Sequence, residues 1–165
     1  ILTGEALIGN EPFGVVLSDD LCFNKGPGVL AQMTELFKQF RCSIVAIQEV
    51  PADQTHNYGV IRGESLKDGI FRVDEMVEKP QPKDAPSNLA IIGRYILTPD
   101  IFDILRETPP GANGEIQITD ALQTQARNGC VMAYKFRGRR FDCGSVPGFV
   151  EATNFVYEHY YLPST

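Results

Sequence analysis

The sequence lacks any apolar run near the ~20 residues that a helix needs to cross a bilayer, so we expect no membrane partner. It also lacks a basic cluster, because 15 Lys and Arg are scattered among 21 Asp and Glu and the formal charge is −6. Nucleic-acid binding through a basic patch is therefore not expected. A small anionic substrate is compatible with this charge, since a local site can be cationic inside an acidic protein.

Cysteine is scarce, and no CxxC pair occurs among the four residues of this type, which are Cys22, Cys42, Cys130 and Cys143. Their wide separation favours reduced thiols in a cytosolic protein over disulfides or a zinc site. The first residues show no basic segment followed by an apolar core, so we expect no signal peptide. Together these absences predict a cytoplasmic location.

What is present is typical of a globular protein. The 165 residues are 43% apolar and 22% charged, a mix that can bury a real core. There are no internal repeats and no low-complexity tracts. We expect a single domain over residues 1–165.

Apolar runs and helical periodicity alternate along the chain. The strand-like "FGVVLSDD" (13–20), the amphipathic "GPGVLAQMTELFKQFR" (26–41) and the strand-like "CSIVAIQEV" (42–50) predict a βαβ unit with parallel strands. Residues 59–63 and 70–77 predict a hairpin that turns at Asp68 and Gly69.

Further elements follow. We expect a strand over 88–97, helices over 100–108 and 115–129, and a strand or strand pair over 131–144. A final helix is expected over 146–162, with one face formed by Phe149, Val150, Thr153, Val156 and Tyr160. The fold class is therefore α/β, with a mixed, mainly parallel central sheet flanked by helices.

Three expected strands end in charged residues, and the carboxyl ends of strands are where open α/β sheets bind ligands. The residues are Asp19 with Asp20, Glu78 with Lys79, and Asp142. Carboxylates suit Mg²⁺, a lysine suits a phosphate, and a glutamate accepts hydrogen bonds from sugar hydroxyls. This combination is what a phosphosugar site with a divalent metal requires.

Each charged residue also has a purely structural interpretation. Asp20 is explained equally well as a turn residue or helix N-cap. Lys79 before a proline is commonly a surface residue, and Asp142 can accept backbone hydrogen bonds in the "DCG" turn. Spacing alone leaves these alternatives open.

Six segments occur in an order that resembles the sugar-1-phosphate nucleotidyltransferases. They are "VVLSDD", "NYGVI", "MVEKP", "SNLAIIGRYIL", "GEIQITDAL" and "FDCGSVPGFVEA". The resemblance extends over nearly the whole chain from Gly4 onward, and "SNLAIIGRYIL" with "GEIQITD" favours the branch that uses UTP. It implies a Rossmann-like nucleotide-diphospho-sugar transferase fold and Mg²⁺-dependent transfer of a uridylyl group from UTP to glucose 1-phosphate.

The resemblance also implies roles for individual residues. Asp19 and Asp142 match the two metal-binding aspartates of the family. Lys79 matches the lysine that contacts the sugar phosphate, and Glu78 matches the glutamate that binds glucose hydroxyls. Gly59 matches a glycine whose backbone approaches the sugar, which a residue without Cβ allows.

Two further residues in matching segments have looser roles. Asn88 lies in a segment that matches the region near the sugar pocket, and Asp20 is treated as a neighbour of the metal site. Glu78 and Lys79 are adjacent, and adjacent side chains on a strand point to opposite faces. Serving one ligand therefore requires a twist at the strand end, where Pro80 constrains the chain.

One family feature does not occur in the sequence. Members of the family carry a first strand and a Gly-rich loop of the form "GxGTR", whose N–H groups cradle the nucleotide. We therefore expect the chain to be the C-terminal portion of a nucleotidyltransferase catalytic domain, without the N-terminal nucleotide-binding strands. We also expect it to be inactive or nearly so in an assay of pyrophosphate release from UTP and glucose 1-phosphate.

Two alternatives stay open at the level of sequence. A thymidylyl- or adenylyltransferase of the same family is compatible, because the base is read mainly by the part that does not occur here. A non-catalytic relative that binds a sugar phosphate is also compatible. The family further implies a homo-oligomer, dimer or tetramer, with the C-terminal helix as a candidate contact.

Overall fold

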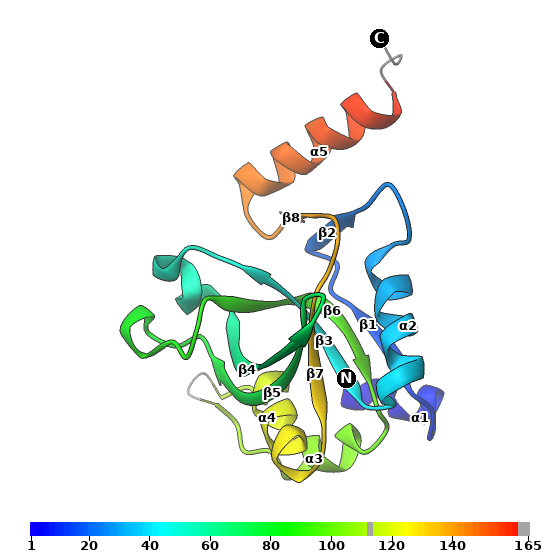
Figure 1. Cartoon of the computed structure of the whole chain (residues 1–165), viewed down its shortest axis with the longest axis vertical. Coiled ribbons are helices and arrows are strands. Elements are labelled where there is room, and N and C mark those ends of the chain that lie inside the picture. The colour runs from blue at the N-terminus through cyan, green and yellow to red at the C-terminus, as the bar shows by residue number, and fades with distance from the viewer. Residues whose placement is uncertain (112–113, 162–165) are drawn as a thin grey trace.

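The computed structural model describes residues 1–111 and 114–161, and it has three layers, a central sheet with helices on both faces (Figure 1). The six strands of this sheet are β1 (Phe13–Val16), β3 (Ser43–Glu49), β4 (Gly59–Lys67), β5 (Ile70–Glu78), β6 (Leu89–Leu97) and β7 (Val131–Lys135). A separate two-stranded ribbon consists of β2 (Asp20–Phe23) and β8 (Arg139–Asp142). The α-helices are α1 (Glu5–Ile8), α2 (Val29–Phe40), α3 (Ile101–Glu107), α4 (Ile118–Asn128) and α5 (Val146–Tyr160). The 3-10 turns are η1 (Leu2–Gly4), η2 (Ala52–Asn57) and η3 (Pro82–Asp84).

β3 explains why the sheet has a core on each face. Its side chains alternate, so that Ile44 and Ala46 pack in the core under α2, while Val45 and Ile47 pack in the core under α3 and α4. All four are fully buried. A continuous apolar strand of this kind is typical of a sheet covered on both faces.

The strand order is β1-β6-β3-β7-β5-β4, and this order corrects one expectation. The fold is mixed α/β as predicted, but the sheet is not mainly parallel, because β3–β7 is its one parallel pair within residues 1–111 and 114–161. β1 and β3 run in the same direction with α2 between them, yet β6 inserts between the two strands and is antiparallel to both. Hydrophobic periodicity reports that a segment is a strand, not which partner it selects.

The β4–β5 hairpin is confirmed, and it is longer than predicted. Its turn residues Asp68 and Gly69 have φ values of 50° and 77°, the left-handed pair that a two-residue hairpin turn prefers. Register shifts occur after Arg62 and after Ser65. These bulges increase the bend of the hairpin, so that β4 also pairs with the start of β6. This second pairing curves one end of the sheet.

The expected strand over 13–20 is interrupted at residue 17. β1 joins the main sheet, whereas β2 starts at Asp20 and pairs with β8 in the ribbon. The segment 131–144 likewise divides into β7 in the main sheet and β8 in the ribbon. The ribbon therefore joins residues from near both ends of the chain at the carboxyl end of β7 (Figure 1).

α5 projects away from the sheet above the ribbon (Figure 1). Leu162, the last residue of the expected helix, lies outside the described residues. The predicted apolar face is not the packed face, because Phe149 and Tyr160 are 60% and 64% exposed while Ala152 is buried. Phe155 makes the main contact instead, with its ring 4.8 Å from that of Phe141 on β8. The helix lies over a narrow ribbon rather than a broad sheet, so one strip of side chains suffices to anchor it.

Candidate functional site

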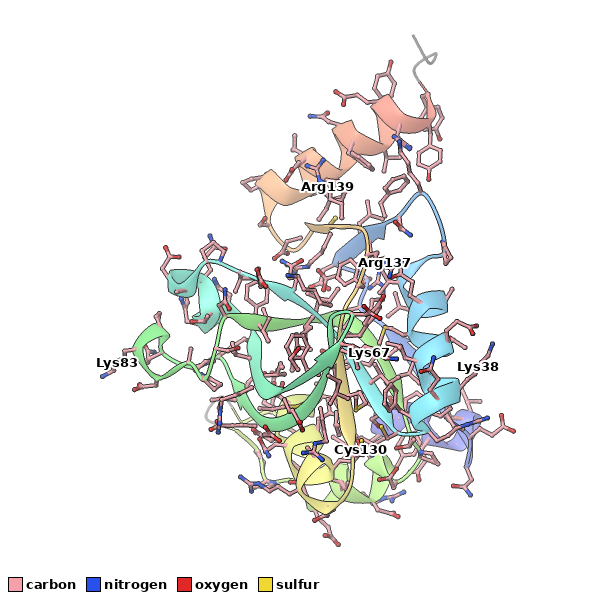
Figure 2. All side chains as sticks on the ribbon, viewed as in Figure 1. Lys38, Lys67, Lys83, Cys130, Arg137 and Arg139 are labelled. Atoms are coloured by element: carbon pink, nitrogen blue, oxygen red, sulfur yellow. The ribbon has the colours of Figure 1, made fainter. Side chains whose placement is uncertain are left out.

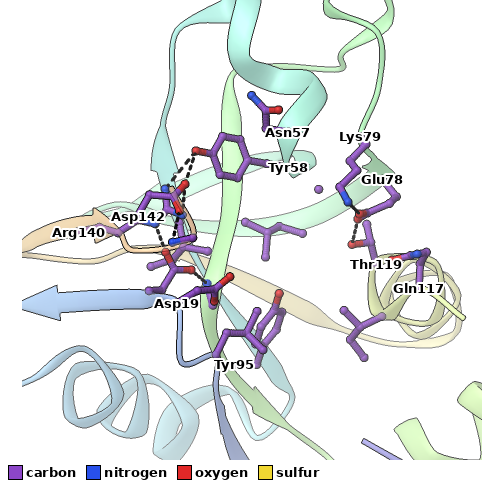
Figure 3. A pocket seen from close by; sticks show the side chains of 18 of the residues that line it. Asp19, Asn57, Tyr58, Glu78, Lys79, Tyr95, Gln117, Thr119, Arg140 and Asp142 are labelled. Carbon is purple, nitrogen blue, oxygen red and sulfur yellow. Dashed lines mark hydrogen bonds and ion pairs between the residues drawn. The ribbon is translucent and has the colours of Figure 1, made fainter. Parts of the chain in front are cut away.

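A cavity of about 600 Å³ opens at the end of the sheet where the ribbon, η2 and the start of α4 meet (Figure 3). Six residues that the sequence singles out line it, and they are Asp19, Asp20, Gly59, Glu78, Lys79 and Asp142. Figure 3 shows Asp19 and Asp142 on one wall and the Glu78–Lys79 pair on the opposite wall. The carboxyl ends of β5 and β8 thus face each other across the hollow.

The acidic wall is built by the β2–β8 ribbon. Asp20 and Asp142 are paired in its register, and the Cys143 N–H donates to the Asp19 carbonyl oxygen at 2.7 Å. A carboxylate oxygen of Asp142 and one of Asp19 lie 3.2 and 3.5 Å from the point where a Cβ would stand on Gly144. The two acids, 123 positions apart by their numbers, therefore converge on one small region.

Arg140 supports this wall from behind, and the sequence reasoning did not find it. Its side chain is 8% exposed and forms ion pairs with Asp20 and with Asp142, the latter at 3.2 Å. Burial by itself lowers the pKa of Arg140, but hydrogen bonds to Tyr58 and Asp20 and the charge of Asp20 outweigh burial and raise it. The guanidinium is therefore a permanent positive charge that orients Asp142.

Asp20 is neither a turn residue nor a helix cap. Its side chain is 6% exposed, and it accepts hydrogen bonds from Arg140 and, at 2.6 Å, from the Gly93 N–H on β6. Gly93 is necessary at this point, because a Cβ there would lie 2.6 Å from the Asp20 carboxylate. Asp20 thus fastens the ribbon to the main sheet while Asp19 faces the cavity.

The opposite wall shows how neighbours on a strand can serve one cavity. β5 ends at Glu78, and Lys79 then adopts a φ of 44°, in the left-handed region. This change of backbone direction breaks the alternation, so that both side chains line the cavity, with Lys79 Nζ 3.8 Å from Glu78 Oε1. Both side chains thus serve one cavity as expected, but through a left-handed residue and not through the strand twist before Pro80 that the sequence suggested.

Gly59 lies beneath the Glu78 carboxylate at the start of β4. A Cβ at this position would lie 2.7 Å from Thr119 Oγ1 and 3.2 Å from Glu78 Oε2. The Thr119 hydroxyl in turn donates to Glu78 Oε2 at 2.6 Å. The glycine therefore makes room for the hydrogen bond that orients the glutamate.

Two aromatic residues complete the lining. The Tyr58 hydroxyl donates to Asp142 Oδ2 at 3.2 Å, and Arg140 lies over the Tyr58 ring at 5.2 Å. Tyr95 forms the base of the cavity (Figure 3). Burial raises the pKa of the Tyr95 phenol, and nearby carboxylates, Glu78 foremost, raise it further. Tyr95 is therefore a neutral hydrogen-bonding group over the whole physiological range.

Asn88 does not line this cavity. It is exposed, and it pairs with Val50 through a backbone hydrogen bond of 3.0 Å and a side-chain bond of 3.4 Å. These contacts connect the start of β6 to the end of β3. Its predicted place near a sugar is untested and stays a prediction.

The acidic wall suits a hard cation that takes only one or two of its ligands from the protein. Among the residues that the structure describes, no group of three or more His, Cys, Asp or Glu is arranged to hold a metal ion. Mg²⁺, however, usually takes only one or two carboxylates and completes its shell with water and substrate phosphates. The converging oxygens of Asp19 and Asp142 meet that requirement.

The residues that sequence reasoning missed are supporting residues. Tyr58 and Thr119 lie within quoted motifs, "NYGVI" and "GEIQITDAL", and Arg140 directly precedes a third, "FDCG". The available signal for these residues was their position in or beside a motif. That position does not predict which residues contact each other, since Tyr58 and Arg140 are 82 positions apart and meet only in the folded chain.

An α/β sheet with opposed acidic and lysine-bearing strand ends is an arrangement suited to a protein that binds phosphates together with a metal ion. Residues 1–159 match the nucleotidyl transferase family, and the chain belongs to that family. The described helices include none that is both long and apolar enough to cross a membrane.

Curated relatives share much of the sequence. A UTP–glucose-1-phosphate uridylyltransferase of Pseudomonas aeruginosa is 68% identical over 162 residues, which are 98% of this chain and 58% of that protein. A protein of the same name from Streptococcus pyogenes is 45% identical over 96% of this chain and 54% of its own length. The chain thus spans somewhat more than half the length of these relatives.

Solved structures agree in fold. A UDP-glucose pyrophosphorylase complexed with UDP-glucose has a TM-score of 0.93 and 62% identity, over 96% of this chain and 60% of that one. A UTP-bound enzyme of Acinetobacter baumannii has a TM-score of 0.85 and 31% identity, over 98% of this chain and 56% of that one. These similarities confirm the resemblance inferred from the motifs.

Proposed function

We propose that this chain is the sugar-phosphate- and metal-binding part of an enzyme that transfers a uridylyl group from UTP to glucose 1-phosphate. The products are UDP-glucose and pyrophosphate. The observation that carries the proposal is that Asp19, Asp142 and Lys79 line one cavity, with Glu78 beside the lysine. Relatives that bear the name of this activity, and one relative in complex with UDP-glucose, support it.

The lysine wall would bind glucose 1-phosphate. Lys79 would supply a positive charge for the phosphate, and it is the group we assign to catalysis, because a cation at the phosphate would stabilise the charge that develops during transfer. Glu78 is held by Thr119 through one oxygen, which leaves lone pairs to accept hydrogen bonds from sugar hydroxyls. The backbone at Gly59 forms the adjoining surface.

The acidic wall would hold the metal ion. Nucleotidyl transferases of this family typically use a divalent metal, and we propose Mg²⁺ at Asp19 and Asp142. When bound, the ion would neutralise phosphate charge during transfer. Arg140 and Tyr58 hold the Asp142 carboxylate in place through its Oδ2 atom, and the Gly144 N–H donates to its Oδ1 atom at 3.1 Å.

The reaction needs positioning more than covalent help from the protein. A phosphate oxygen of glucose 1-phosphate attacks the α-phosphorus of UTP. The bond between the α-phosphorus and the oxygen that bridges it to the β-phosphate breaks, and pyrophosphate leaves with that electron pair. Lys79 orients the attacking phosphate, while Glu78 fixes the sugar so that the oxygen is in line. Loss of either contact is therefore expected to slow transfer as well as weaken binding.

Calorimetry with glucose 1-phosphate or UDP-glucose in the presence of Mg²⁺ tests the lysine wall. We expect Lys79→Ala to weaken binding about 10- to 100-fold, the range for a hydrogen bond to a charged group. Lys67→Ala is the matched control, since this lysine lies at the end of β4 in the hairpin, outside the cavity lining (Figure 2). Equal affinities for the two variants would contradict the proposal.

The same measurement in EDTA tests the metal site. UDP-glucose binding is expected to depend on Mg²⁺, and Asp19→Asn should remove most of that dependence by replacing a carboxylate with a neutral amide. Asp74→Asn, at an exposed position on β5, should leave it intact. Binding that is indifferent to Mg²⁺ in the unmodified chain would argue against this part of the proposal.

Some expectations stay predictions. A homo-oligomer, a cytoplasmic location and the extent of the domain are not tested by the structure. We also retain the expectation that these 165 residues bind the sugar phosphate but release little pyrophosphate, since no "GxGTR" loop occurs in them. Turnover at ordinary enzyme rates would contradict that expectation.

A further inference from the structure

Two cysteines meet at the end of the sheet remote from the cavity. Cys42 and Cys130 are 88 positions apart, and their sulfur atoms lie 3.2 Å from each other. Each stands between a helix and a strand, Cys42 after α2 and before β3, Cys130 after α4 and before β7. The parallel pairing of these strands begins at Ser43 and Val131, so it sets the two cysteines side by side.

The pair is accessible from solvent. Both side chains are half-buried, and both line a cavity of about 250 Å³ that is also bounded by Thr98, Asp100 and Gln125. Figure 2 shows Cys130 at the lower end of the sheet, whereas the ribbon that carries Asp142 lies at the upper end. A small oxidant can therefore reach the sulfurs without entering the proposed substrate cavity.

We propose that Cys42 and Cys130 are a modification site, a dithiol that is converted to a disulfide by peroxides or by low-molecular-weight disulfides. With hydrogen peroxide, one sulfur attacks an oxygen, the O–O bond breaks, and a sulfenic acid and water form. The second sulfur then attacks the sulfenic sulfur and releases another water. The two thiols lose two electrons and two protons, and one peroxide yields two waters.

The local geometry assigns an order to the two sulfurs. The Cys42 thiol donates its hydrogen to the Cys130 sulfur, so Cys42 keeps its proton in this contact and we assign the first attack to Cys130. Burial, and then the hydrogen bond to Cys130, raise the pKa of Cys42 to about 12, which suits the later, resolving role. Because the raised pKa disfavours the Cys42 thiolate, the reduced pair is not stabilised as an anion at that sulfur, and this favours the disulfide once it forms.

The disulfide would change the stability of the chain and not its binding of substrate. A bond between residues 42 and 130 would tie together the central strands β3 and β7 and restrict the unfolded chain over a long loop. We expect oxidation to raise the melting temperature by roughly 5 to 10 °C. Affinity for UDP-glucose should not change, because the cross-link lies at the opposite strand ends.

Mass spectrometry of the whole chain tests the proposal directly. The chain is treated with oxidised glutathione or with one equivalent of hydrogen peroxide, denatured, alkylated and digested. We expect a peptide pair linked through Cys42 and Cys130, while Cys22 and Cys143 are alkylated. A chain with four alkylated cysteines, or a cross-link between other cysteines, would overturn the proposal.

Melting temperatures of the unmodified chain and of three cysteine variants give an independent readout. The unmodified chain should melt higher after oxidation and return to its original value with dithiothreitol. Cys42→Ala and Cys130→Ala should show no such shift, whereas the control Cys22→Ala, on β2, should keep it. If Cys42→Ala or Cys130→Ala fails to fold, the linked peptide from the unmodified chain still shows whether the disulfide forms. An equal shift in Cys42→Ala would refute the assignment.

Discussion

Lys79 adopts a left-handed backbone conformation, which is uncommon for a residue that is neither glycine nor asparagine. Its N–H donates to the carbonyl oxygen of Tyr58, the residue directly before β4, at 3.0 Å. This hydrogen bond holds the backbone conformation of Lys79 in place. Such a conformation costs about 1–2 kcal/mol. The protein tolerates this cost where it brings the lysine and Glu78 to one cavity, and strain of this kind is often found at functional sites.

Comparing glycine with alanine at position 79 separates the cost of the left-handed backbone from the effect of losing the lysine charge. We expect Lys79→Gly to be about 0.5–1 kcal/mol more stable than Lys79→Ala, because glycine accepts a positive φ and only part of that gain is lost to the freedom of the unfolded chain. Both variants should bind glucose 1-phosphate equally poorly. Urea unfolding and calorimetry measure the two effects, and a more stable alanine variant would show that the backbone is not strained.

Arg140 carries the second prediction at this scale. Removing it leaves the Asp20 carboxylate buried without its cation, so we expect Arg140→Ala to lower the free energy of unfolding by about 3–5 kcal/mol. Adding Asp20→Asn removes the unpaired charge and keeps an acceptor for the Gly93 N–H, so roughly half of the loss should return.

The neighbouring arginine is the control for that experiment. Arg139 pairs with Glu151 at the surface, where both side chains are more than half exposed (Figure 2). Arg139→Ala is expected to cost about 1–2 kcal/mol in urea unfolding, because the exposed ion pair contributes little and the guanidinium also lies over the Phe141 ring at 4.4 Å. Equal costs at positions 139 and 140 would show that the buried pair contributes nothing specific.

At the scale of elements, the β4–β5 hairpin shapes one side of the cavity. Gly63 stands at the first register shift, and a Cβ there would lie 2.2 Å from the Arg72 carbonyl oxygen. The bulge therefore requires glycine, and it allows the hairpin to curl back to β6. A flat hairpin would not bring Gly59 and Glu78 to the wall that faces the ribbon.

The turn of this hairpin gives a matched pair of variants. Gly69→Ala should lower the free energy of unfolding by about 1–2 kcal/mol, because φ is positive and the new Cβ would lie 3.1 Å from the Lys135 carbonyl oxygen. Asp68→Asn should change it by less than about 0.5 kcal/mol, since asparagine also accepts the left-handed region. Chemical denaturation measures both, and equal losses would contradict the turn assignment.

At the scale of the whole molecule, the site is assembled from distant parts of the chain. The ribbon contributes residues near positions 19 and 142, while the hairpin contributes residues 59, 78 and 79. The net charge is −6, and four acids line the cavity against Lys79 and Arg140. An anionic ligand would therefore need both the lysine and a cation bound at the acidic wall to offset the local negative field.

Hydrogen exchange tests whether one ligand spans both walls. With UDP-glucose and Mg²⁺, amide exchange should slow together in residues 58–60 and in residues 140–145. The hairpin tip, residues 66–70, serves as an internal reference and should not change. Protection of one wall alone would mean that the ligand does not bridge the cavity, and the proposed site would have to be revised.

The fold was predictable to the extent that it depends on local pattern. The helix over 29–40, the buried strand over 43–49 and the Asp68–Gly69 turn follow from periodicity and from left-handed turn residues. The insertion of β6 between β1 and β3, and the division of residues 13–23 between two sheets, were not predictable. They depend on which strand edges pair, and local pattern does not encode that choice.

The amino-acid sequence by itself determined the α/β class, the family and the charged residues at strand ends, because residue type, order and spacing record these directly. Only the tertiary structure decided that Asp19 and Asp142 converge, that Arg140 and Tyr58 brace them, and that two distant cysteines touch. The physical reason is that, apart from the local pair of Arg140 and Asp142, each of these contacts joins residues more than 80 positions apart. Strand pairing and burial bring them together, and neither is visible in any short segment of the chain.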